Sequence, residues 1–240
     1  MTDFSRFDVP ALYNSFMNAA PFNHIIIDNF LDTDYLNEIM EEVKGYEKML
    51  DEDYRIKETD YVVQSKKIGI SDYNRFGPKV QQFIDFTRSK EMISFIANVT
   101  GIHDIKDDPT LFGGGIHRTT TGGRLAIHAD FNIHPHTKKH RRINILLYLN
   151  KDWKPEYNGE LELWDKSMTN CCHSIPPIFN RLVMFRITDD AFHGHPKYWE
   201  APQHIPRLSF ALYYYTDDRP EHEKSGSHMA LWQKRNNIEY

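Results

Sequence analysis

Cysteine is scarce in this sequence, and its scarcity excludes several kinds of site. Only two of the 240 residues are cysteines, Cys171 and Cys172, and they are neighbours in the chain. Adjacent cysteines rarely meet the geometry of a disulfide bond, and one pair makes no disulfide framework. A zinc site built on cysteine pairs needs a spacing that this sequence lacks. We therefore expect two free thiols in a reducing compartment.

Long apolar runs are also absent. The longest aliphatic stretches, such as 25–27 and 145–149, have the length of strands, whereas a membrane-spanning helix needs about 18 or more apolar residues. The first residues lead into no apolar targeting segment. We expect a cytoplasmic protein that does not engage a membrane.

The sequence has no excess of positive charge either. Its formal net charge is −5, which argues against a nucleic-acid partner. One local exception is the basic run Lys138-Lys139-His140-Arg141-Arg142. That run is either the solvated start of a strand or an anion-attracting rim beside a pocket.

The residues that are present fit one domain, 1–240. The chain is long enough for a substantial core, and 40% hydrophobic and 13% aromatic residues suit a sandwich or barrel lined by large rings. No internal repeat or low-complexity stretch divides it. We expect three parts, which are a helical N-terminal part, a β-helix core and a C-terminal tail, at 1–108, about 109–216 and 217–240.

The N-terminal part carries one strand signal and two helix signals. Residues 24–30 form a short β-branched run that indicates a strand. Thr33 or Asp34 is the expected N-cap of a helix that continues to about Tyr46. A second helix, with a break in its apolar pattern, is expected over about 78–99.

From about residue 109 short apolar stretches alternate with turn signals such as Gly122-Gly123 and Asn158-Gly159. Regular short strands of this kind indicate an antiparallel sandwich or barrel. We predict a mainly β protein with flanking helices around a double-stranded β-helix (jelly-roll, cupin-like) core, although the periodicity alone also allows another small β-barrel. The candidate strands are 124–131, 142–149, 160–164, 181–187 and 207–215.

The sequence His128-Ala129-Asp130 is the central chemical signal. Positions i and i+2 of a strand point to the same face, so His128 and Asp130 can reach one metal ion, and His193 on a later strand could complete the set. Two imidazoles and one carboxylate leave three adjacent coordination positions open, as iron(II) oxygenases require. So short a pattern also arises by chance, and each histidine alone could be an ordinary surface or core residue.

Two strands supply the context. In 207–215 the alternation places Arg207 and Ser209 on one face, where a guanidinium fork and a hydroxyl could hold a carboxylate. The alternative is an arginine that faces solvent at the start of a strand. In 142–149 Asn144 and Tyr148 share a face, which suits either a polar cavity or a core strand with one buried asparagine.

Taken together, these residues resemble the 2-oxoglutarate/iron(II) oxygenases of the prolyl-4-hydroxylase-like type. The resemblance covers about residues 110–216, with its motifs in the family's order, and the early strand 24–30 is also typical of bacterial members. Five ordered motifs within about a hundred residues are far more specific than any one of them. They are His128-Ala129-Asp130, Tyr148-Leu149-Asn150-Lys151-Asp152-Trp153, Asn158-Gly159-Glu160-Leu161, Phe192-His193-Gly194 and Arg207-Leu208-Ser209.

The resemblance implies roles for single residues. His128, Asp130 and His193 would be the iron(II) ligands, with His195 a rival for the third position. Arg207 would pair with the distal carboxylate of 2-oxoglutarate, supported by Ser209 and Tyr148, and Asn144 would face this co-substrate. The implied cofactors are Fe(II), 2-oxoglutarate and O2, with ascorbate as a further candidate.

Two departures from the family pattern concern the surroundings of this site. Many prolyl hydroxylases have a second tyrosine ten residues before the first iron histidine, where this sequence has Arg118, so Arg118 is a candidate contact of the co-substrate or the substrate. The interval from His193 to Arg207 is also longer than in some relatives. We expect the extra loop, 197–206 with Tyr198 and Trp199, to lie near the mouth of the site.

The implied reaction is hydroxylation, because related halogenases lack the carboxylate that Asp130 provides. We expect a small or carrier-bound metabolite, such as an amino acid, a sugar or a natural product, as the substrate, since fold resemblance does not fix the substrate. The alternatives are a prolyl or other protein side chain as the target, a jelly-roll module that binds without catalysis, and a zinc hydrolase with the same ligands. The motifs predict no oligomeric state.

Overall fold

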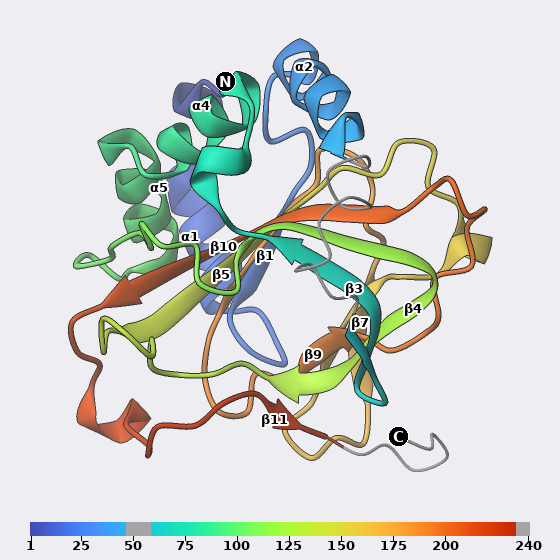
Figure 1. Ribbon diagram of the computed structural model, residues 1–240. Helices are drawn as coiled ribbons and strands as arrows, with labels where there is room; N and C mark the ends of the chain where they lie inside the picture. Colours follow the sequence, from blue (N-terminus) through green and yellow to red (C-terminus); the bar gives the residue numbers. More distant parts are fainter. Residues whose placement is uncertain (47–58, 234–240) are drawn as a thin grey trace.

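The computed structural model describes residues 1–46 and 59–233. Figure 1 shows the helices packed on one side of a strongly curved antiparallel sheet, with the described C-terminal end on the opposite side. The helices are α1 (Val9–Met17), α2 (Thr33–Lys44), α4 (Pro78–Thr87) and α5 (Lys90–Thr100), with short 3-10 turns at Phe4–Arg6, Tyr73–Arg75, Pro155–Tyr157 and Glu221–Glu223. None of the helices in the described ranges has the length and apolar character that crossing a membrane requires.

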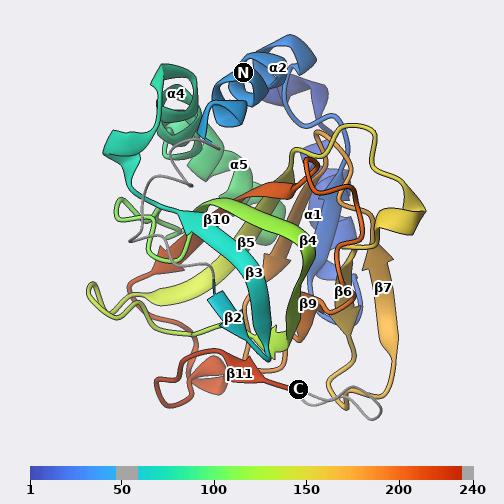
Figure 2. The same ribbon diagram turned by 45° about the vertical axis from the view of Figure 1, so that its right-hand side comes forward.

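The strands curl into the two facing layers of a double-stranded β-helix (Figure 2), which confirms the predicted fold class. Their order in the sheet is β1-β8-β5-β10-β4-β9-β6-β7, with β3 and β11 also pairing with β4, and β2 pairing with β3. The strands are β1 (His24–Ile27), β2 (Thr59–Tyr61), β3 (Gln64–Ile70), β4 (Gly115–Ala129), β5 (His140–Tyr148), β6 (Leu161–Trp164), β7 (Cys171–Ile175), β8 (Leu182–Arg186), β9 (His193–His195), β10 (Arg207–Thr216) and β11 (Leu231–Trp232).

The helix boundaries follow from capping. Asp32 caps α2, because its carboxylate accepts a hydrogen bond from the Tyr35 amide at 2.9 Å, so the expectation of Thr33 or Asp34 as the cap was wrong. The break expected within 78–99 is a true boundary between α4 and α5. There Ser89 caps α5 by accepting a hydrogen bond from the Met92 amide at 3.2 Å.

Strand β4 differs most from its prediction. It begins at Gly115 rather than at 124, because Gly122 and Gly123 lie inside the strand and do not end it. A Cβ on Gly123 would lie 2.5 Å from Thr119 Cγ2, and Gly122 has φ +82°. The first part of β4 pairs with β10, whereas its last residues pair with β9 and β11. The glycines therefore sit where one strand passes from one layer to the other.

Successive side chains of β10 point alternately to two faces of the strand, one toward the core and the other toward the site. Phe210, Leu212 and Tyr214 are buried in the large core that the sheet shares with the helices. Arg207 and Ser209 point to the other face, between the two layers. In the edge strand β7, Cys171 and Cys172 are exposed and form no disulfide bond, which confirms the expectation that they stay as thiols.

Candidate functional site

His128, Asp130 and His193 come together at one end of the β-helix. His128 lies on β4 directly opposite His193 on β9, and Asp130 follows the last residue of β4. One ligand atom from each of the three lies within 4.8 Å of the others, so the group could hold a metal ion. The Nε2 atoms of His128 and His193 lie 3.5 and 3.3 Å from the two Asp130 carboxylate oxygens.

Backbone carbonyls orient both imidazoles. Nδ1 of His128 lies 2.8 Å from the Ala126 carbonyl oxygen, and Nδ1 of His193 lies 2.8 Å from that of Ala191. Because a carbonyl only accepts, each Nδ1 carries the proton and each Nε2 keeps its lone pair. Burial also lowers the pKa of His128, which favours the neutral, metal-binding form.

Two neighbours fix the carboxylate of Asp130. Asn144 donates to its Oδ2 at 2.6 Å, and Arg141 donates to the same oxygen at 3.1 Å. Arg141 also donates from Nε to Asn144 Oδ1 at 2.9 Å and lies between the rings of Phe131 and Tyr213. Although burial alone would raise it, the charge of the Arg141 guanidinium is the main cause that holds the pKa of Asp130 well below its usual value. This carboxylate is therefore ionised and an acceptor only.

A cavity of about 200 Å³ adjoins the three candidate ligands, and we call it the metal-side cavity. Arg207 and Ser209 of β10 line it, as the alternation predicted, and Asn144 lines it from β5. Arg207 is buried, and its Nε donates to the Gly159 carbonyl oxygen at 2.8 Å. The cavity thus combines a metal-binding group with a fixed guanidinium.

Buried polar atoms of two residues, Tyr148 beside Arg207 and His195 in the cavity wall, have no hydrogen-bond partner among the described residues. The Tyr148 hydroxyl is buried without a hydrogen bond, and its ring centroid lies 5.2 Å from the Arg207 guanidinium carbon. Both ring nitrogens of His195 are likewise unpaired, and burial lowers the pKa of this imidazole well below its usual value. Buried polar groups without partners are costly, so the arrangement fits a polar guest that would supply them. His195 itself is outside the group of three candidate ligands.

Further residues that the motifs did not indicate line the same cavity. Burial, together with the charge of Arg207, lowers the pKa of Lys67 on β3 to about 8. Tyr213 continues the Arg207–Ser209 face of β10, so the strand alternation could have found it. Trp232 of β11 lies opposite His128, with ring centroids 4.8 Å apart. Nothing in the sequence pattern indicates that contact, because it joins residues about a hundred positions apart.

Arg118 is not brought to this cavity. Its partner across β10 is Leu208, on the face toward the helices, whereas its neighbour His117 pairs with Ser209 and lines the metal-side cavity. The two aromatic residues of the loop 197–206 differ in their exposure. Trp199 is fully buried against Gly159, whereas Tyr198 is 48% exposed.

The basic run 138–142 matches neither of its two interpretations in full. Lys138 is exposed, but Arg141 and Arg142 are buried, and Arg142 pairs with Glu223 at 3.2 Å. Only Arg141 of this run reaches the metal-side cavity, where it holds Asp130 and not a free anion.

A sequence model described as the 2OG-Fe(II) oxygenase superfamily matches residues 114–237. The chain is also similar to solved structures. A Pseudomonas putida prolyl-4-hydroxylase is 18% identical with a TM-score of 0.57, and the match covers 86% of this chain and 100% of that one. A Trichoplax adhaerens prolyl hydroxylase, in complex with a hypoxia inducible factor oxygen degradation domain peptide fragment, is 19% identical with a TM-score of 0.63, over 90% and 94%.

A third similar structure is HygX from Streptomyces hygroscopicus, with nickel, 2-oxoglutarate and hygromycin B bound. It is 9% identical with a TM-score of 0.56, and the match covers 92% of this chain and 95% of that one. At such identities the likeness to these three proteins is one of fold.

Proposed function

The chain belongs to the 2OG-Fe(II) oxygenase superfamily, and from that premise we propose that it hydroxylates an unactivated C–H bond of a small or carrier-bound metabolite. It is a 2-oxoglutarate- and Fe(II)-dependent dioxygenase. The observation that carries the proposal is the meeting of His128, Asp130 and His193 with the buried Arg207 at one cavity. A binding module without catalysis needs no such combination.

His128, Asp130 and His193 hold the iron in this proposal, and Arg207 holds the far carboxylate of 2-oxoglutarate. The guanidinium fork matches a carboxylate, while Ser209 and the unpaired Tyr148 hydroxyl add hydrogen bonds. When bound, iron and 2-oxoglutarate activate O2 to oxidise the C–H bond, with release of succinate and CO2. The chain contributes orientation through Arg141 and Asn144.

The remaining walls exclude water and select the substrate. Leu146 and Phe185 form an apolar side of the cavity, and Trp232 lies beside His128 on the side of β11. A cavity of about 200 Å³ suits a small group, such as one ring of a metabolite. The hygromycin B bound in the similar HygX structure is in line with a small-molecule substrate.

A prolyl or other peptidyl side chain is the second candidate. It is favoured by the similar Trichoplax adhaerens enzyme, whose structure contains a peptide fragment. Succinate release, measured with panels of free amino acids, sugars and short proline-containing peptides, separates the two. A product that gains one oxygen atom only in the peptide panel would overturn the metabolite proposal.

An anaerobic titration tests the site itself. Adding Fe(II) and 2-oxoglutarate should give a weak visible charge-transfer band, and Arg207→Ala should raise the 2-oxoglutarate concentration needed while leaving iron binding unchanged. His193→Ala should lose both iron binding and the charge-transfer band. Arg118→Ala is the matched control, because Arg118 lies on the other face of the same strand pairing and should leave the band unaltered. Absence of the band in the intact protein would exclude the proposed roles.

A further inference from the structure

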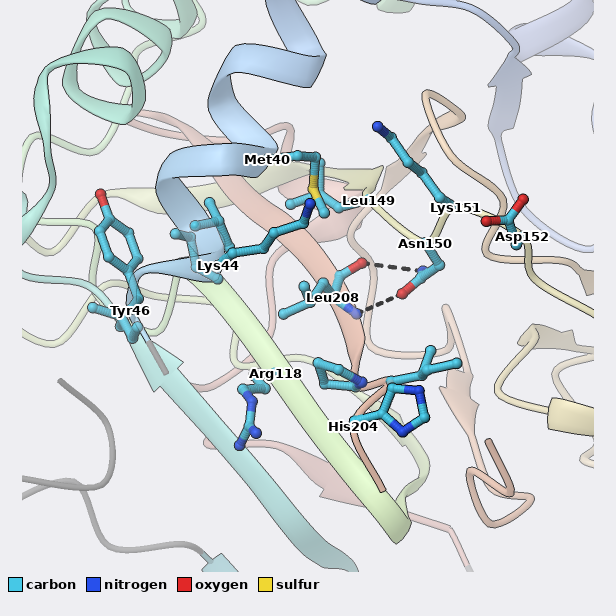
Figure 3. A pocket seen from close by; sticks show the side chains of 15 residues that line it. Met40, Lys44, Tyr46, Arg118, Leu149, Asn150, Lys151, Asp152, His204 and Leu208 are labelled. Carbon is cyan, nitrogen blue, oxygen red and sulfur yellow. Dashed lines mark hydrogen bonds between the residues drawn. The ribbon is translucent and has the colours of Figure 1, made fainter. Parts of the chain in front are cut away.

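A second cavity, which we call the helix-side cavity, lies on the opposite face of β10 from the candidate iron site. Its volume is about 300 Å³, at the lower end of the range of small-molecule sites. The C-terminal half of α2 forms one wall, and β3, β4 and the start of β10 form the other (Figure 3). Leu208 lines it, while the adjacent Arg207 and Ser209 line the metal-side cavity.

The floor of the helix-side cavity is aliphatic. Its side chains come from α2, from three strands and from the segment after β5, and no described strand or helix fills the space between them. They are Met40, Val43, Ile70, Ile116, Leu149 and Leu208. Apolar surface of this kind gains free energy when an apolar group covers it, so the floor suits a hydrocarbon tail.

The rim of the cavity is cationic. Lys44, Arg118 and Lys151 line it, whereas Asp152 is the one carboxylate among its described lining residues. In Figure 3 the Lys44 and Lys151 ammonium groups lie on one side of Leu208, and the Arg118 guanidinium lies on the other. Lys44 already pairs with Glu41 at 2.6 Å. The rim therefore favours an anion over a neutral or cationic guest.

Arg118 is the rim residue that needs a partner. Its Nε is shielded from solvent and makes no hydrogen bond, and it forms no ion pair with a described carboxylate. A partly buried guanidinium of this kind is stabilised by an anion that accepts its hydrogen bonds. Among groups that also carry an apolar tail, a carboxylate matches the planar fork of arginine.

We propose that the helix-side cavity binds an amphipathic monocarboxylate, with its hydrocarbon tail on the aliphatic floor and its carboxylate on Arg118. The site is separate from the co-substrate position, because the two cavities open on opposite faces of β10. Its occupant is a molecule of medium-chain fatty acid type, and not the short, doubly charged 2-oxoglutarate.

Calorimetric titration of the purified full chain with decanoate tests this site, at concentrations below micelle formation. Decanoate should bind with one site per chain. Decanol has the tail without the charge, and succinate has charge without the tail. Each should have a dissociation constant at least about tenfold higher than that of decanoate. Equal binding of decanol would overturn the role of Arg118 as the carboxylate partner.

Variants separate this site from the co-substrate site. Arg118→Gln should weaken decanoate binding about tenfold, since a charge-assisted pair is lost, and Val43→Phe should abolish it by filling the floor. Lys90→Gln, which removes a cation on α5 remote from the cavity, should change nothing. If decanoate binding survives Arg118→Gln unchanged, or is lost in Arg207→Ala, the proposal is overturned. Thermal unfolding checks each variant for folding, and Arg118→Gln decides the matter alone if Val43→Phe does not fold.

Discussion

One oxygen of the Asp130 carboxylate, Oδ2, accepts two hydrogen bonds. The Asn144 side-chain amide donates one at 2.6 Å, and the Arg141 guanidinium donates the other at 3.1 Å. Such outer contacts orient a metal-binding carboxylate, and their loss commonly weakens metal affinity. We expect Asn144→Leu to raise the dissociation constant for Fe(II) about 10- to 100-fold. A competitive anaerobic titration against a chelator measures it.

The control for that change is Asn18→Leu, because Asn18 is exposed at the end of α1, away from the site. Its Fe(II) affinity should equal that of the unaltered protein. Unchanged affinity in Asn144→Leu would mean that Arg141 alone orients Asp130.

Removal of the Tyr148 hydroxyl should affect the stability of the fold and the binding of 2-oxoglutarate in opposite directions. It is buried without a partner in the free protein, and burial raises its pKa, so it stays protonated and can donate. Tyr148→Phe removes an unsatisfied group and should keep or increase the free energy of unfolding, by about 1 kcal/mol. The same change should raise the KM for 2-oxoglutarate by about three- to tenfold, because the bound carboxylate loses one hydrogen bond.

Urea unfolding and steady-state kinetics check the two halves of this prediction separately. A variant that is destabilised, with its KM unaltered, would show that the hydroxyl serves the fold and not the co-substrate.

Among the elements, the turn before β6 fixes Arg207. Gly159 has φ +78°, its carbonyl accepts from Arg207, and a Cβ there would lie 2.5 Å from Trp199 Cε3 and 3.1 Å from Arg207 Cδ. Gly159→Ala should therefore displace the guanidinium, raise the KM for 2-oxoglutarate and destabilise the fold by about 1–3 kcal/mol.

Gly226 offers the matched control for Gly159→Ala, because nothing lies within 4 Å of the position that its Cβ would take. Kinetics and thermal unfolding of Gly226→Ala should match the unaltered protein. If Gly159→Ala behaves like Gly226→Ala, the turn does not position Arg207.

Strand periodicity explains which parts of the site could be predicted. In β10 the alternation is regular through Ser209, so the sequence places Arg207 and Ser209 on one face. Along β4 the pairing shifts register, once opposite Ser65–Lys67 and once between Leu125 and His128. The regular alternation of side chains between the two faces is therefore interrupted between His128 and Arg118. As a result, His117 faces the metal-side cavity and Arg118 does not.

The short strands were beyond prediction for a different reason. β9 and β11 have three and two residues, too few for any periodic signal. Their positions depend on long-range contacts, such as the pairing of Trp232 with His128. The motifs led to the prediction of His193 as a ligand although the strand that carries it could not be recognised, because the chemistry of a metal site restricts residue types more than a strand does. The structure brings His193 together with His128 and Asp130.

In the whole molecule, burial of neutral histidines links stability to pH. Burial lowers the pKa of six of them in the described chain, which are His24, His117, His128, His134, His140 and His195. In the unfolded chain each takes up a proton at about pH 6.5, whereas the folded protein resists it. The unfolded state then binds more protons, so the free energy of unfolding falls as pH decreases through this value.

We therefore expect the metal-free protein to lose stability between about pH 7.5 and about pH 5.5, as measured by urea unfolding with a chelator present. Carboxylates with lowered pKa, such as Asp28 beside Arg181, do not contribute in this window, because they lose their stabilisation only below about pH 4. His24→Gln, remote from the metal site, should reduce the slope by removing one titrating group. Stability that stays constant or rises on acidification would show that the buried imidazoles are protonated in the folded state.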